Sequence, residues 1–113
     1  MLKIYDLWQR ARDEGGETVL GSLDLHTHAC YLIFGYLEPG QSGRILNPGP
    51  GHEEIICVVS GRAVVTGPDG AQELQPGNAF YLKGDVTYTM SNPGEEEVLY
   101  LAGGGHSPGS EHH

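Results

Sequence analysis

The feature that most constrains the fold of this chain is a series of short apolar runs separated by glycine- and proline-rich turns. The 113 residues include 18 glycines and 7 prolines, which divide the chain into segments too short for long helices. Runs such as CYLIFGYL and EIICVV are rich in β-branched and aromatic residues and end at turn-forming residues. About eight such runs at nearly regular spacing predict an all-β sandwich or barrel.

The sequence predicts a single domain with a short segment at each end. Within residues 1–16, four apolar side chains have the i, i+3, i+4, i+7 spacing of a short amphipathic helix: Ile4, Leu7, Trp8 and Ala11. We expect this helix to pack on the barrel, which the turn pattern places at residues 17–105. Residues 106–113, HSPGSEHH, are expected to form a flexible tail, and the last two histidines have the composition of an affinity tag.

Charge and cysteine content limit the classes of partner and the compartment. The formal net charge is -9 with only six lysines and arginines, which are scattered, so we expect neither a nucleic-acid partner nor an anionic membrane surface. Cys30 and Cys57 lie far apart in apolar runs and are interpreted as buried free thiols. Because the sequence also shows no secretory or membrane-spanning segment, it predicts a cytoplasmic protein.

Residues 37–101 resemble the cupin family of small β-barrels. The resemblance rests on the LEPGQ turn, on Glu54 followed by six residues and Gly61, on the turns of the two central hairpins, and on the segment from Gly77 to Asn92. It implies a jelly-roll barrel, also called a double-stranded β-helix. In the cupin pattern a His-x-His pair stands shortly before the glutamate, whereas this sequence has NPGP at 47–50. Tyr88 stands where the family usually has its last metal-binding histidine.

A metal site would therefore need ligands from elsewhere in the chain. His52 and Glu54 have i, i+2 spacing, which places both side chains on one face of a strand, roughly 6–7 Å apart. His26 and His28 form a second i, i+2 pair at the start of the preceding strand. If the two strands are neighbours, these four residues are candidate ligands of a divalent Zn, Ni, Fe or Mn ion. The alternative is that His52 and Glu54 form a solvated strand end, and that His26 and His28 bind nothing.

Three further residues are candidate contacts to a small molecule. Tyr81 and Tyr88 are predicted to form aromatic walls of the barrel, and Tyr88 either hydrogen-bonds a ligand or fills the space of an absent metal. Asn92 closes the second cupin motif and, with Pro93 and Gly94, is also expected to close a turn.

Two apolar runs predict self-association. Residues 30–36 and 55–59 are apolar on both strand faces, although a strand with one solvated face should alternate. We interpret the runs as covered on both sides, and predict a homodimer through the outer sheet.

Three functions remain open at this level. The first is a metal-dependent cupin that binds a small organic molecule, either with or without catalysing its conversion. The second is a metal-free binding or sensing module, and the third is a structural protein whose dimer surface is its function. The sequence contains no nucleophile–base pair, phosphate-binding loop or cofactor fingerprint, so it assigns no catalytic residue and leaves open whether the protein is an enzyme.

Overall fold

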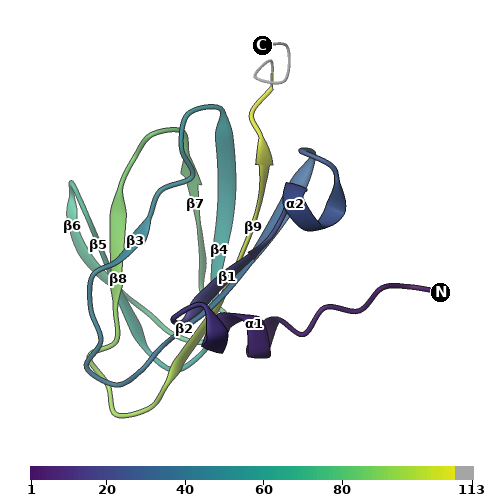
Figure 1. The fold of residues 1–113 in the computed structure, drawn as a ribbon. Helices are drawn as coiled ribbons and strands as arrows, with labels where there is room; N and C mark the ends of the chain where they lie inside the picture. The colour runs from purple at the N-terminus through teal and green to yellow at the C-terminus, as the bar shows by residue number, and fades with distance from the viewer. Residues whose placement is uncertain (109–113) are drawn as a thin grey trace.

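The structure, a computed structural model, describes residues 1–108 and consists of two antiparallel sheets that face each other (Figure 1). The five-stranded sheet has the order β1 (Glu17–Leu20), β2 (Cys30–Leu37), β9 (Val98–His106), β4 (His52–Ser60), β7 (Ala79–Lys83). The four-stranded sheet has the order β3 (Arg44–Leu46), β8 (Tyr88–Ser91), β5 (Ala63–Gly67), β6 (Gly70–Leu74). This arrangement confirms the predicted all-β, double-stranded β-helix fold.

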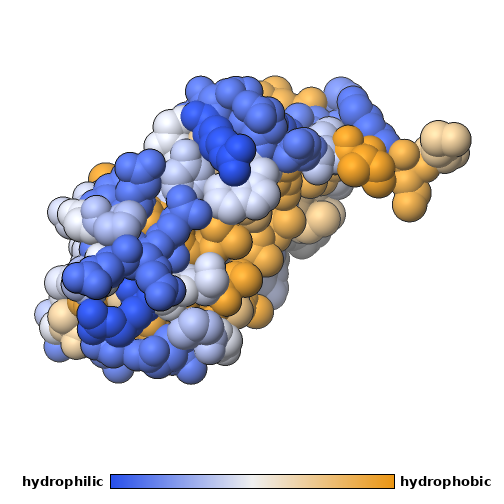
Figure 2. Space-filling view, turned by 90° about the horizontal axis from the view of Figure 1, so that it is seen from below, coloured by the Kyte–Doolittle hydropathy of each residue, from blue (hydrophilic) through white to orange (hydrophobic). Residues whose placement is uncertain are grey.

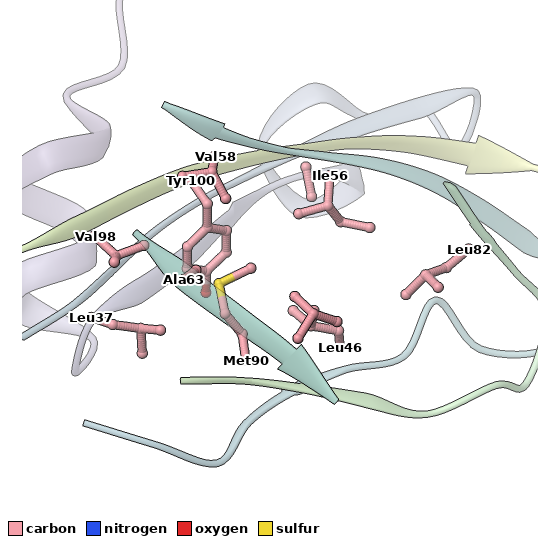
Figure 3. Close-up of a cluster of buried hydrophobic side chains, with 11 residues drawn as sticks. Leu37, Leu46, Ile56, Val58, Ala63, Leu82, Met90, Val98 and Tyr100 are labelled. Atoms are coloured by element: carbon pink, nitrogen blue, oxygen red, sulfur yellow. The ribbon is translucent and has the colours of Figure 1, made fainter. Parts of the chain in front are cut away.

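The hydrophobic core lies between the sheets because successive side chains of a strand point to opposite faces. In β4, Ile56 and Val58 are fully buried, whereas Ile55 is 60% and Val59 is 45% exposed. Figure 3 shows the core, in which the ring of Tyr100 lies among apolar side chains of both sheets. The apolar run of β4 therefore does alternate in burial within one chain, and its outer face is not covered by the described residues.

A short helix covers one part of the outer face of the five-stranded sheet. Helix α1 (Leu7–Asp13) begins after Asp6, whose side chain accepts a hydrogen bond of 3.0 Å from the backbone N–H of Gln9. Trp8 packs on Phe34 and Tyr36 of β2, with ring centroids 5.3 and 5.5 Å apart. The residues before α1 extend away from the barrel (Figures 1 and 2). The α1 helix therefore shields the outer face of β2, while β9, β4 and β7 have no such cover among residues 1–108.

Gly61 explains in physical terms why the Glu-x6-Gly spacing ends in glycine. Its φ angle is +78°, a region that L side chains rarely adopt, and an added Cβ would lie 2.5 Å from the carbonyl oxygen of Glu97. Only glycine allows β4 to turn towards β5 this close to the start of β9.

Several local features differ from expectation. A second helix, α2 (Ser22–Leu25), separates β1 from β2. Cys30 is exposed and Cys57 is half-buried, because both side chains lie on the outward face of their strands. Strand β9 extends to His106, one residue into the predicted tail, and residues 109–113, with His112 and His113, lie outside the described residues.

Neither helix of the described chain is long and apolar enough to cross a membrane.

Candidate ligand site at the open end of the barrel

The site is built around a buried carboxylate, that of Glu54 near the start of β4. Glu54 is only 6% exposed and points into the barrel, in phase with Ile56 and Val58. Its carboxylate accepts a hydrogen bond of 2.6 Å from the hydroxyl of Tyr31 on β2. A buried polar group requires such a partner, because the loss of its hydration is otherwise uncompensated.

Strand β9 lies between these two residues, and Gly104 makes the contact possible. Tyr31, Gly104 and Glu54 are in register across β2, β9 and β4. A Cβ added to Gly104 would lie 2.4 Å from Cζ of Tyr31. The missing side chain therefore leaves the space in which the Tyr31 ring crosses β9 to reach Glu54.

The environment of Tyr31 keeps its hydroxyl protonated. Burial raises the pKa of Tyr31 well above its usual value of 10.0, and the hydrogen bond to Glu54 and the charge of Glu54 raise it further. Tyr31 is therefore a permanent donor to Glu54 at neutral pH.

Three histidines lie at the same end of the barrel. His52 and His106 are paired in register on β4 and β9, and their ring centroids are 4.9 Å apart. The ring of His28 lies 6.1 Å from that of His106, and the ring of Tyr31 lies 6.0 Å from that of His52. The Nδ1 of His52 is 3.1 Å from the carbonyl oxygen of Pro50, which leaves Nε2 directed elsewhere.

His106 is a site residue that the sequence analysis assigned to the tail. The alternation of inward residues Val98, Tyr100 and Ala102 continues through Gly104 to His106. The glycines at 103–105 concealed this pattern, because residues without side chains give no hydrophobic period.

A small cavity of about 90 Å³ lies inside the barrel next to Glu54. Its wall is made of two carboxylates, one phenol, one amide and apolar residues: Glu17, Glu54, Tyr100, Asn47, Ile33, Ile45, Leu46 and Ala102. Glu17 and Tyr100 belong to a network in which the Tyr100 hydroxyl donates to Glu17 and accepts a 2.6 Å hydrogen bond from Arg44. Arg44 and Glu17 also form an ion pair at 3.8 Å. Among residues 1–108, one carboxylate of the cavity therefore has a cationic partner, and the other is held by a neutral phenol.

The sequence profile of the family described as the cupin domain matches residues 33–104, which is more than half of the chain. The chain belongs to the cupin family. No curated protein matches its sequence.

Solved cupin structures agree with this fold at low sequence identity. A Cupin 2 conserved barrel domain protein from Salinispora arenicola is 17% identical, with a TM-score of 0.73 over 99% of this chain and 95% of that one. A predicted oxalate decarboxylase from Thermotoga maritima is 19% identical, with a TM-score of 0.66 over 83% and 86% of the two chains. The Cnp3 cupin domain of Schizosaccharomyces pombe is 15% identical, with a TM-score of 0.62. That match includes 70% of this chain and 57% of the other, so this chain spans little more than half of the length of that structure. These likenesses concern the fold.

The predicted four-residue metal set does not assemble in this cupin. Within residues 1–108, no three His, Cys, Asp or Glu side chains are placed to hold one metal ion. Strand β9 separates β2 from β4, so the strand after His28 is not the neighbour of the strand that begins at His52. His26 lies in the left-handed conformation at the end of α2 rather than in a strand, and the i, i+2 geometry assumed for His26 and His28 does not apply. The donors of this cupin therefore do not fit the family's three-histidine, one-glutamate pattern.

Tyr88, at the fourth ligand position, points into the barrel and packs over Gly67. It lines a second cavity of about 190 Å³ with Phe80, Tyr81 and Leu82 of β7 and with Val65, Gln72 and Leu74 of the other sheet. This largely apolar surrounding is compatible with both earlier interpretations, a contact to a ligand and a side chain that fills the space of a metal.

The structure corrects the predictions for Tyr81 and Asn92. Tyr81 is 55% exposed on the outer face of β7, where its hydroxyl donates a 2.5 Å hydrogen bond to Glu53, because the alternation of β7 turns Leu82 inward instead. Asn92 is 1% exposed, and its amide donates to the carbonyls of Leu37 and Glu96 and accepts from the N–H of Gly94. The side-chain amide of Asn92 thus forms its hydrogen bonds with backbone groups and closes the expected turn. It does not point to the ligand site.

A larger hollow of about 660 Å³ lies at the opposite end of the barrel, among the turns around Gly61, Pro76 and Pro93. It is open to solvent, and its cation Arg62 is paired with Glu73 at 2.9 Å. We place the candidate site at the Glu54 end, where a buried carboxylate faces a partly enclosed space.

Proposed function

We propose that this cupin binds a small organic molecule at the open end of its barrel, without using the family's usual metal ligands. The observation that carries the proposal is the buried carboxylate of Glu54, which faces a cavity and is fixed by Tyr31. Ligand sites are typically concave and apolar with a few convergent polar groups, and this end of the barrel has that composition. Cupins that share only the fold differ in chemistry, so the proposal depends on this chain's own residues.

Each residue has a distinct part in the proposed site. Glu54 is the charged acceptor, and the protonated Tyr31 fixes its orientation. Ile33, Leu46 and Ala102 supply an apolar wall below it. His52 and His106, paired at the same end of the barrel but outside the cavity wall, offer ring nitrogens to the exposed part of a ligand.

A thermal-shift screen of small metabolites in the presence of a chelator tests this function. We expect at least one compound class to raise the melting temperature, and expect that rise to be lost in Glu54→Gln. Glu95→Gln, in the exposed turn between β8 and β9, is the matched control and should keep the response. Two results would contradict the proposal: a rise in melting temperature that persists in Glu54→Gln, and a rise that is seen without the chelator but not with it.

A divalent transition metal is the second candidate, and the pairing of His52 with His106 favours it. Neutral imidazoles on adjacent strands are a common half-site for Zn, Ni or Fe. The donors would then be His52 and His106, with or without Glu54, in place of the predicted His26 and His28. Elemental analysis of protein lacking residues 109–113 tests this: stoichiometric metal that disappears in His52→Ala would support a metal-dependent cupin, whereas metal-free protein that still binds the organic ligand would exclude it.

We also propose that a second copy of the chain covers the bare part of the outer sheet. Ile55, Val59, Tyr81 and the half-buried Cys57 and Leu101 lie there, beside the exposed charged residue Lys83 at one end. Apolar side chains with a charged border are typical of homodimer interfaces, which are more apolar than other protein surfaces.

A further inference from the structure

We infer that the ligand carries a positively charged nitrogen, as in a protonated amine, and that this group binds against Glu54. The inference rests on the proposed function and specifies its substrate class. It follows from the charges around the cavity, from its size and from the aromatic ring beside Glu54.

The first step is a comparison of the two carboxylates that line the same cavity. Glu17 lies within 3.8 Å of the guanidinium of Arg44, so its charge has a counter-charge within the protein. Glu54 takes part in none of the ion pairs found among residues 1–108, and its hydrogen-bond partner there is the neutral Tyr31. Acidic side chains are rarely buried to this degree without a cationic partner. A cationic ligand group would supply the missing charge.

The second step is the size of the space. A cavity of about 90 Å³ has room for more than one water and accommodates a compact group such as an alkylammonium head. The wall also includes apolar side chains, and the alkyl part of an amine would contact Ile33, Leu46 and Ala102. An anionic head would instead face Glu17 and Glu54 at close range, which like-charge repulsion disfavours.

The third step concerns the aromatic ring beside Glu54. Tyr31, whose hydroxyl bonds the Glu54 carboxylate, has its ring 6.0 Å from that of His52. Aromatic faces attract cations through their quadrupole, and tyrosine is among the effective residue types. The net charge of -9 adds a general attraction for cationic solutes and repels anionic ones.

The test uses three probes of equal length: propylammonium, 1-propanol and propionate, each titrated at constant ionic strength and followed by the NMR shifts of the backbone amides of Glu54 and Ala102. We expect propylammonium to bind at least tenfold more tightly than either of the other two. Glu54→Gln should abolish this preference. Glu53→Gln, which removes the same charge one residue earlier from the outward face of the same strand, should leave the propylammonium affinity within twofold. Glu54→Met also removes the charge and leaves no buried amide without a partner; it should abolish the preference as well, and it serves as the second variant if Glu54→Gln fails to fold.

The outcomes separate the inference from the function beneath it. If 1-propanol or propionate binds as tightly as propylammonium, the inference is wrong while small-molecule binding stands. A preference for the cation that persists in Glu54→Gln or in Glu54→Met also overturns it. If none of the three probes shifts these amides and the metabolite screen is also empty, both the inference and the proposed function fail. Stoichiometric Zn²⁺ binding that shifts the Glu54 amide and blocks propylammonium would assign the missing charge to a metal and overturn the inference.

Discussion

The hydroxyl of Tyr31 donates a hydrogen bond to the buried carboxylate of Glu54 across an intervening strand that carries Gly104 at the crossing point. Three adjacent strands are thus adapted to one another at a single level of the barrel. A larger residue at 104 would displace the phenol, and the carboxylate would then lose the neutral donor that fixes it.

Gly104→Ala should therefore both destabilise the protein and disturb the site. The added methyl group would overlap Tyr31 and approach the carbonyl oxygen of Glu53 at 2.7 Å, so we expect a loss of about 1–3 kcal/mol in the free energy of unfolding. Urea unfolding measures the change. Gly103→Ala is the control, since nothing lies within 4 Å of its added Cβ, and equal losses in the two variants would contradict this account.

Asn92→Ala should lower stability without changing the ligand preference. The substitution removes three hydrogen bonds and leaves the buried carbonyl of Leu37 without its partner, which we expect to cost about 2–4 kcal/mol. Asn47→Ala also removes three hydrogen bonds, to Asp85, Thr87 and the N–H of Gly49, but these are exposed, so it should cost less than about 1 kcal/mol. If Asn92→Ala changed probe affinity in the folded protein, Asn92 would be a ligand contact after all.

Tyr31 and Tyr100 should ionise after the exposed tyrosines as the pH is raised. Burial raises the pKa of both, with added contributions from Glu54 at Tyr31 and from Glu17 at Tyr100. A raised folded-state pKa means that the stabilisation is complete below the ordinary tyrosine pKa of about 10 and is lost as the pH rises through the folded-state value. We expect tyrosinate absorbance to show this late phase close to alkaline unfolding, with a smaller amplitude in Tyr31→Phe. Full titration of all six tyrosines at their ordinary pKa in folded protein would refute the assignment.

Ile55→Lys should prevent self-association through the bare part of the outer sheet. Ile55 is 60% exposed near the centre of that surface, and a buried unpaired ammonium group is strongly unfavourable in an interface. Light scattering coupled to gel filtration should give a dimer for the wild type and a monomer for the variant. Thr66→Lys, on the outward face of the other sheet, should remain dimeric; a monomeric wild type would show that the apolar surface has another role.

The fold could be predicted from the sequence because its evidence is local. Each turn-forming residue and each alternating strand can be recognised within a few residues, and Gly61 is required by its own backbone conformation and its close neighbours. The inward position of Glu54 was only one of two interpretations, because residues 55–59 are apolar on both strand faces and indicate no phase. The His26, His28, His52 and Glu54 set failed because it assumed that strands close in sequence are neighbours in the sheet, whereas β9 is inserted between β2 and β4.

The sequence alone thus determined the cupin barrel and the loss of the family's histidine pair, both of which depend on residue type and spacing. Only the tertiary structure decided which residues meet at the open end. It placed Tyr31 against Glu54, His106 beside His52, Arg44 on Glu17 and Tyr81 on the outer face. These contacts join residues from different strands, and their partners are set by strand order and register, which no local pattern in the chain specifies.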